Sequence, residues 1–135
     1  MAPFQRYQDV QVGDSFPPVP MNFDVAPETV AAFCAATGDT RDRRDTNAAP
    51  SMLAAVYLIE LLKSRQSPPG GIHAKQSFRF HRKLRVGETL ALLGTVKEKY
   101  VRKDRRYVVS DFEAHDTSGG LVASGTITSI WGQDA

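Results

Sequence analysis

The first third of the chain shows a short strand pattern followed by a short helix pattern. Residues 21–25 follow a turn-rich, proline-containing approach and indicate a strand. Pro27 suits the first helical position because it has no amide hydrogen to leave unbonded, and Gly38 is a typical helix stop. The side chains that recur at helical spacing between them are Val30, Phe33, Cys34 and Thr37. The pattern therefore predicts a strand and a helix, before a wholly polar stretch over residues 39–47.

Residues 52–62 are the most hydrophobic part of the chain, apolar at ten of eleven positions with Glu60 as the exception. The segment is too short to cross a membrane, and a surface helix would be apolar on one side only. We therefore expect a helix that is buried on nearly every face. It ends at residues 67–71, where Ser-Pro-Pro-Gly-Gly breaks any helix.

The remainder of the chain has the alternating pattern of four strands, which begin at Ile72 and continue over residues 89–102, 106–116 and 121–131. The short links predict an antiparallel meander. Burial of the apolar helix is most complete if the sheet curls around it, which makes an α+β fold. A flatter sheet leaves one side of the helix to a second subunit, so we expect a dimer or larger assembly in either case.

Composition is that of one soluble domain over residues 1–135. The chain is 41% hydrophobic with a net charge of +2, which excludes a disordered protein. The single cysteine, Cys34, excludes an intramolecular disulfide, and its place on an apolar stripe indicates a packed thiol. No apolar run reaches the roughly 18 residues that span a bilayer, and the start lacks a signal-peptide pattern. We therefore expect a cytoplasmic protein with no membrane contact.

Three segments in this order resemble the MaoC-like dehydratases, in the N-terminal or FAS1-like dehydratase branch of the hot-dog fold. They are Ala36-Thr37-Gly38-Asp39, the Ala49-Pro50 step before the apolar helix, and residues 78–90, which read Phe-Arg-Phe-His-Arg-Lys-Leu-Arg-Val-Gly-Glu-Thr-Leu. The resemblance spans nearly the whole chain. It implies a hot-dog fold, an antiparallel sheet wrapped around a central apolar helix.

The resemblance also implies the hydration of 2-enoyl thioesters of coenzyme A or acyl carrier protein, or the reverse dehydration. This chemistry needs a base for water, an acid for the α-carbon and donors for the enolate. Active family members carry Gly-Asp-x-Asn-Pro-x-His, which Gly38 and Asp39 match. The enolate donors are expected in the backbone at the start of the helix, around Ser51, Met52 and Leu53. Apart from the thioester substrate, no cofactor or metal is expected.

The chain departs from this motif where the family has its histidine. Arg41, Asp42 and Arg44 stand in place of the asparagine, proline and histidine. A guanidinium, with a pKa above ~12, has no lone pair to accept a proton, so Arg44 cannot replace the base. Arg44 is able instead to pair with Asp39 or to bind a phosphate.

Three interpretations of Asp39 therefore stay open. A MaoC-like partner subunit supplies the intact dyad while this chain completes the acyl tunnel. Alternatively, the chain is active through another residue, with His73 and His81 as the candidates by chemistry. Finally, Asp39 only forms the turn at the helix end, and both histidines are ordinary surface groups.

The segment from Lys75 to Arg106 holds eleven basic residues against three acidic ones. Such a concentration favours an anionic ligand, either coenzyme A phosphates or an acidic carrier protein, or it is simply a solvated sheet face. The candidate contacts are Arg79, Arg82, Lys83, Arg85, Lys103 and Arg105. Nucleic acid is not expected, because Phe78 and Phe80 lie on the apolar side of their strand and offer no stacking surface.

Two other functions compete with a hydro-lyase. Hot-dog thioesterases use an acid to direct water at the thioester carbonyl, and Asp39 or Glu60 offers one. A non-catalytic subunit that binds acyl-CoA is the third possibility. Measuring loss of enoyl absorbance and release of free thiol separates the two reactions.

Overall fold

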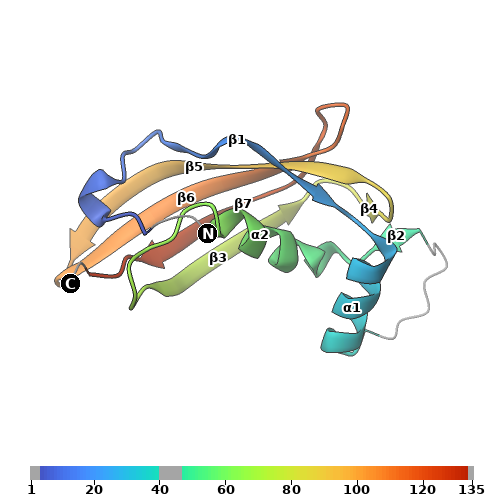
Figure 1. Cartoon of the computed structure of the whole chain (residues 1–135), viewed down its shortest axis with the longest axis horizontal. Helices are drawn as coiled ribbons and strands as arrows, with labels where there is room; N and C mark the ends of the chain where they lie inside the picture. The colour runs from blue at the N-terminus through green and yellow to red at the C-terminus, as the bar shows by residue number, and fades with distance from the viewer. Residues whose placement is uncertain (1–3, 40–46, 134–135) are drawn as a thin grey trace.

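A five-stranded antiparallel sheet forms the body of the molecule (Figure 1). The computed structural model describes residues 4–39 and 47–133. The strands, in spatial order, are β1 (Ser15–Asp24), β5 (Thr89–Arg102), β6 (Arg105–His115), β7 (Leu121–Ile130) and β3 (Ile72–Phe80). The predicted four-strand meander is confirmed for β5, β6 and β7 only, because β3 pairs with β7 and not with β5. The strands β1 and β3 are the two edges of the sheet.

The helix α2 (Ala54–Leu62) lies along one face of this sheet (Figure 1). Its inward side chains Tyr57, Leu58 and Leu61 are almost fully buried against sheet residues such as Phe112 and Ile127. The Tyr57 ring also meets Phe23 of β1 edge-on, with ring centroids 5.6 Å apart. The predicted α+β architecture, a sheet around a mostly apolar helix, is confirmed.

The prediction that this helix is buried on nearly every face is wrong for the single chain. Met52 and Ile59, seven residues apart and hence on one side of the helix, are 49% and 56% exposed. The sheet covers only the opposite side. The first turn is also tighter than predicted, because Ser51–Leu53 forms a 3-10 helix, η2, ahead of α2.

The first strand is longer than predicted, since β1 begins at Ser15 rather than at residue 21. Prolines at positions 17, 18 and 20 argued against a strand there. Because β1 is an edge strand, they remove no hydrogen bond from the sheet interior, and its pairing with β5 shifts register between Phe16 and Met21.

The strand β3 does not show the half-buried alternation that its sequence predicts. It is the other edge of the sheet, and its side chains are exposed except for Phe78, which is half-buried. Ile72 and Phe80, at its two ends, are both exposed. In a single chain, the apolar face of this strand is therefore largely uncovered.

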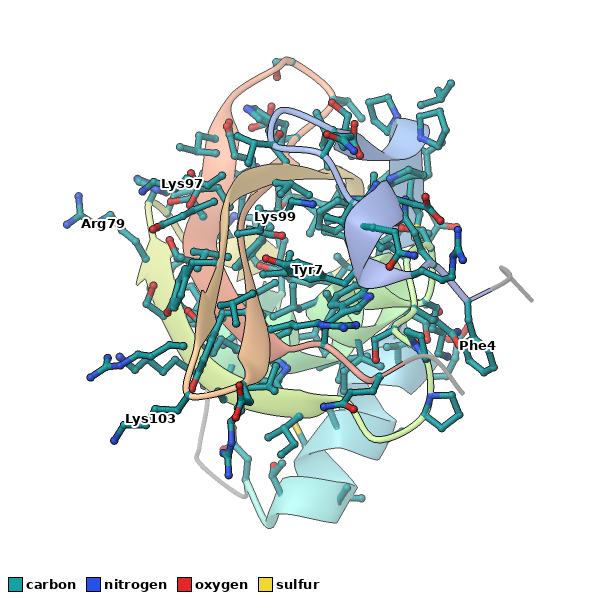
Figure 2. The ribbon with its side chains drawn as sticks, turned by 90° about the vertical axis from the view of Figure 1, so that its left-hand side faces the viewer. Phe4, Tyr7, Arg79, Lys97, Lys99 and Lys103 are labelled. Atoms are coloured by element: carbon teal, nitrogen blue, oxygen red, sulfur yellow. The ribbon has the colours of Figure 1, made fainter. Side chains whose placement is uncertain are left out.

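Three small elements complete the frame around the start of α2. The helix α1 (Pro27–Thr37) follows β1, and two short strands, β2 (Ala48–Ala49) and β4 (Leu84–Arg85), pair with each other. A 3-10 turn, η1 (Tyr7–Asp9), lies near the N-terminus. In both views α1 extends beyond the β3 edge of the sheet (Figures 1 and 2). None of the helices in the described ranges is long and apolar enough to span a membrane.

Candidate functional site

Asp39 borders a largely apolar cavity of about 590 Å³ between α1 and the start of α2. The residues that line it are Phe33, Thr37, Asp39, Pro50, Ser51, Met52 and Ala55. The residue with the candidate carboxylate and two of the candidate donor residues are thus brought together, although ten residues lie between Asp39 and Pro50 in the sequence. A carboxylate beside an apolar hollow is a typical arrangement of a small-molecule site.

The end of α1 holds Asp39 in place. Gly38 adopts a left-handed conformation, with φ of 71°, and the Asp39 amide donates to the Cys34 carbonyl at 3.0 Å. This is the usual glycine termination of a helix, and the predicted stop at Gly38 is confirmed. The Thr37 hydroxyl donates to the Phe33 carbonyl at 2.9 Å, so the last turn is also fixed from its side chain.

Two of the three candidate donor residues at the start of the apolar helix, Ser51 and Met52, line the cavity, and Leu53 does not. The Leu53 amide donates to the Pro50 carbonyl at 3.0 Å, and the Leu53 side chain is fully buried in the core. Ser51 and Met52 both line the cavity. Their amides belong to the first turn, where N–H groups have no partner within the helix and point along its axis. Ser51 and Met52 therefore stay the candidate donors.

The two candidate histidines lie elsewhere in the chain. His81 lines a hollow of about 540 Å³ on the outer face of the sheet, together with Arg79, and its Nε2 is 3.0 Å from the Ser124 hydroxyl. His73 lies at the start of β3, in a hollow of about 340 Å³ at the far end of α2. Neither lines the Asp39 cavity of its own chain.

The basic residues divide into two groups. Arg82 is held by carboxylates: it forms a two-pronged ion pair with Glu88 and donates to Asp116 at 2.9 Å. These bonds keep the pKa values of Glu88 and Asp116 below their usual range, and they raise the pKa of Arg82. Arg82 thus ties two turns together in the chain. The Arg85 amide adds a bond to Glu88 at 2.7 Å.

Other basic side chains face solvent. Lys83 is exposed beside β4, and Arg79 and Lys103 project away from the sheet (Figure 2). Lys103 and Arg105 flank the turn between β5 and β6, at the opposite end of the long strand β5 from α1 (Figure 1). Lys99 instead lies against the Tyr7 ring, with its Nζ 4.6 Å from the ring centroid.

Sequence reasoning missed Arg65, which follows α2 and enters the interior. Its guanidinium pairs with Asp14 at 3.1 Å and lies 5.2 Å from the Phe16 ring centroid. Its Nη1 is buried and, among the residues that the structure describes, has no hydrogen-bond partner. Arg65 and His73 line the same hollow of about 340 Å³, which therefore has a basic lining. The available signal was an arginine three residues after the end of the apolar segment.

Several predicted groups lie outside the described residues, namely Arg41, Asp42 and Arg44. Glu60, the candidate acid of a thioesterase, does not line the Asp39 cavity and pairs with Lys63 at 2.9 Å. Within residues 4–39 and 47–133, no cluster of histidine, cysteine and acidic side chains has the makings of a metal site.

Solved structures with the same fold cover almost the whole chain. R-hydratase PhaJ1 from Pseudomonas aeruginosa, in its unliganded form, is 19% identical with a TM-score of 0.79, over 95% of this chain and 86% of that one. An (R)-hydratase from A. caviae involved in PHA biosynthesis is 20% identical with a TM-score of 0.76, over 93% and 99%. The MaoC-like dehydratase from Rhodospirillum rubrum is 20% identical with a TM-score of 0.73, over 95% and 97%.

These likenesses establish the hot-dog fold that the sequence motifs predicted. A hot-dog-like protein from Thermanaerovibrio acidaminovorans matches as well, with a TM-score of 0.64 over 90% of this chain. Two further matches are the ChsH1-ChsH2 and HadBC complexes from Mycobacterium tuberculosis, with TM-scores of 0.73 and 0.66. No protein-family model and no curated protein matches the sequence.

Proposed function

We propose that this hot-dog chain is a hydro-lyase for 2-enoyl thioesters, adding water across the double bond or removing it. The observation that supports this most directly is that Asp39, Ser51 and Met52 line one cavity. It combines an acid-base group, hydrogen-bond donors and room for an acyl group of moderate size. The names of the structural neighbours, two R-hydratases and a MaoC-like dehydratase, agree with this reaction class.

In the proposed reaction the thioester carbonyl accepts hydrogen bonds from the Ser51 and Met52 amides. Their N–H groups, at the positive end of α2, stabilise the negative charge that forms on the oxygen as water attacks the β-carbon. The Asp39 carboxylate accepts a hydrogen bond from that water and orients it. The apolar walls, including Phe33 and Ala55, hold the acyl chain.

A second proton-transfer group is required, because Arg44 cannot accept a proton at neutral pH. We propose that this group comes from outside the chain's own Asp39 loop, from another subunit. Two of the structural neighbours, ChsH1-ChsH2 and HadBC, are complexes, which agrees with a site that needs more than one subunit. The exposed side chains of Met52 in η2 and Ile59 in α2 are consistent with a face that another subunit covers.

The test is an assay of the purified chain with crotonyl-CoA and longer enoyl-CoAs, and with the same acyl groups on a carrier protein. Loss of enoyl absorbance without release of free thiol is the result expected for hydration. Release of free thiol without hydration of the double bond would establish a thioesterase instead. Saturable thioester binding without either signal would establish a non-catalytic binding subunit.

A further inference from the structure

Arg65 is a buried cation with one donor group unused within the described part of the chain. Its side chain is only 11% exposed, and its Nη2 donates to the Asp14 carboxylate at 3.1 Å. Its Nη1 is buried and has no hydrogen-bond partner among residues 4–39 and 47–133. A buried donor without an acceptor is costly, and folded proteins seldom keep one. A ligand that brings an acceptor to this guanidinium is therefore stabilised there.

Two hollows lie next to each other at Arg65, at the end of α2 opposite α1 (Figure 1). The outer one is the hollow of about 340 Å³ that also contains His73, and the inner one has a volume of about 20 Å³. Both are lined by Leu62, Arg65, Ser129 and Trp131. The inner hollow has room for about one water-sized group, and the outer one for a short organic chain. A ligand that occupies both has a small head and a longer tail.

The inner hollow fits a small anionic head group. Ser110 of β6 and Ser129 of β7 line it together with Arg65. Among the described residues, no acidic side chain lines either hollow, so an anion meets no like charge there. Asp14 bonds the Nη2 group of Arg65 from outside both linings. A guanidinium binds a carboxylate more strongly than a neutral carbonyl, because both partners are then charged.

The outer hollow fits an apolar tail. Pro68, Pro69 and Ile72 line it together with the Trp131 side chain. Trp131 is 7% exposed, and its indole N–H donates to the Gln5 carbonyl at 2.7 Å, which fixes the position of the ring. Burial of aliphatic carbons against such walls is favoured by the hydrophobic effect. A bare inorganic anion leaves these walls in contact with water, so the lining favours an organic anion.

We propose that the two hollows form a second ligand site, which binds a small aliphatic carboxylate. A carboxylate oxygen accepts a hydrogen bond from the Arg65 Nη1 group at the inner hollow, and the alkyl chain lies against Trp131 and Pro69 in the outer one. The site shares none of its described lining residues with the Asp39 cavity, which lies at the other end of α2. The inference therefore does not depend on the proposed hydro-lyase reaction.

Trp131 is the only tryptophan of the chain, so its fluorescence reports on this site. Titration of the purified protein with hexanoate is expected to change that fluorescence saturably, because the alkyl chain contacts the indole. Hexanamide has the same chain without the charge and is expected to bind at least ~10-fold more weakly. Sulfate has no tail and should displace hexanoate only at ~10-fold higher concentration or more. Displacement by sulfate at equal concentration would overturn the assignment to an organic carboxylate.

Arg65→Met removes the guanidinium and keeps an unbranched side chain of similar length. The variant is expected to bind hexanoate at least ~10-fold more weakly than the wild type, since the charge-assisted hydrogen bond is lost. Arg102→Met is the matched control, because Arg102 is an exposed arginine at the end of β5 that lines neither hollow, and its affinity should equal that of the wild type. Urea unfolding of both variants is measured alongside, because Arg65→Met also breaks the ion pair with Asp14.

A second pair of variants keeps the test decisive if Arg65→Met does not fold. Ile72 lines the outer hollow but is 53% exposed, so a polar residue at this position leaves the core intact. Ile72→Asp brings a negative charge near the bound carboxylate and is expected to bind hexanoate at least ~3-fold more weakly than the neutral Ile72→Asn. The inference is overturned by the absence of a saturable fluorescence change, by equal affinity for hexanoate and hexanamide, or by equal hexanoate binding in the two Ile72 variants.

Discussion

Asp39 illustrates how a single side chain gains its place from backbone geometry. The left-handed Gly38 turns the chain, and the bond from the Asp39 amide to Cys34 closes the helix end behind it. A glycine has no Cβ to clash at φ of 71°, which makes the step from helix to carboxylate compact. Asp39 consequently lines the cavity from the end of α1, while Ser51 and Met52 line it from η2.

Asp39→Asn keeps this backbone geometry but removes the negative charge. We expect turnover of enoyl thioesters to fall on the order of 100-fold or more. The melting temperature should stay within a few degrees, since surface changes usually alter stability by less than about 0.5 kcal/mol. Arg44→His, which restores the motif base within the chain, is expected to raise turnover. Unchanged turnover in Asp39→Asn would remove this residue from the mechanism.

Arg82 gives a pH dependence with a definite sign. Its bonds to Glu88 and Asp116 depress the pKa of both carboxyls below their ordinary values of 4.5 and 3.8. Groups with depressed pKa stabilise the fold above those values and lose that contribution as the pH falls through the folded-state pKa. We expect Arg82→Gln to have a lower free energy of unfolding than the wild type at pH 7. As the pH falls below 4.5, the variant should lose less of this free energy than the wild type does. Urea unfolding at several pH values measures this difference.

At the scale of elements, close approach of strands and rings fixes how the sheet bends around α2. Gly125 on β7 faces Phe112 on β6 and pairs with Phe78 on β3. An added Cβ there would overlap the Ser77 carbonyl and the Phe112 ring. The aromatic ring occupies the space that a side chain at position 125 would need, so packing depends on that glycine.

Gly125→Ala is therefore expected to destabilise the fold by roughly 1–3 kcal/mol through overpacking. The obstacle is partly backbone, which gives way less easily than a flexible side chain. Thr117→Ala, in the exposed turn after β6, is the control and should change the unfolding free energy little. Equal stability of the Gly125 variant and the wild type in urea would contradict this account of the sheet.

At the scale of the molecule, Met52 and Ile59 are exposed on the side of the helix that the sheet does not cover, and β3 is an edge strand with Ile72 and Phe80 exposed at its ends. Helix residues buried by the sheet account for only half of the hydrophobic segment that the sequence carries. A contiguous exposed apolar surface commonly marks a protein interface. Met52 also lines the Asp39 cavity, so we expect an interface on this side of the helix to lie beside the candidate site.

Ile59→Asp tests this directly, because a charge buried in an interface without a partner opposes association. We expect the wild type to sediment as a dimer at micromolar concentration, and the variant to dissociate at least ~10-fold more readily, equivalent to about 1.4 kcal/mol. Val101→Asp is the matched control, since Val101 is 61% exposed but lies at the far end of β5. Equal dissociation of both variants would count against an interface on α2.

Much of this protein follows from local sequence patterns. Periodicity located α1 and its stop at Gly38, and the long apolar run and its Pro-Pro-Gly-Gly break located α2. Alternation and turn residues located β5, β6 and β7 because these features act over a few neighbouring residues. The Gly-Asp step marked Asp39 as a candidate for the same reason: the motif is contiguous in the chain.

Tertiary structure alone decided which surfaces meet. Hydrophobicity of Ile72, Phe80 and Ile59 did not reveal that they are exposed, because burial depends on strand order and on which side of α2 the sheet covers. Nor did the sequence reveal that Arg82 is held by two acids, that Arg65 enters the interior, or that His73 stands far from Asp39 in its own chain. Such contacts join residues distant in sequence, and only the path of the folded chain brings them together.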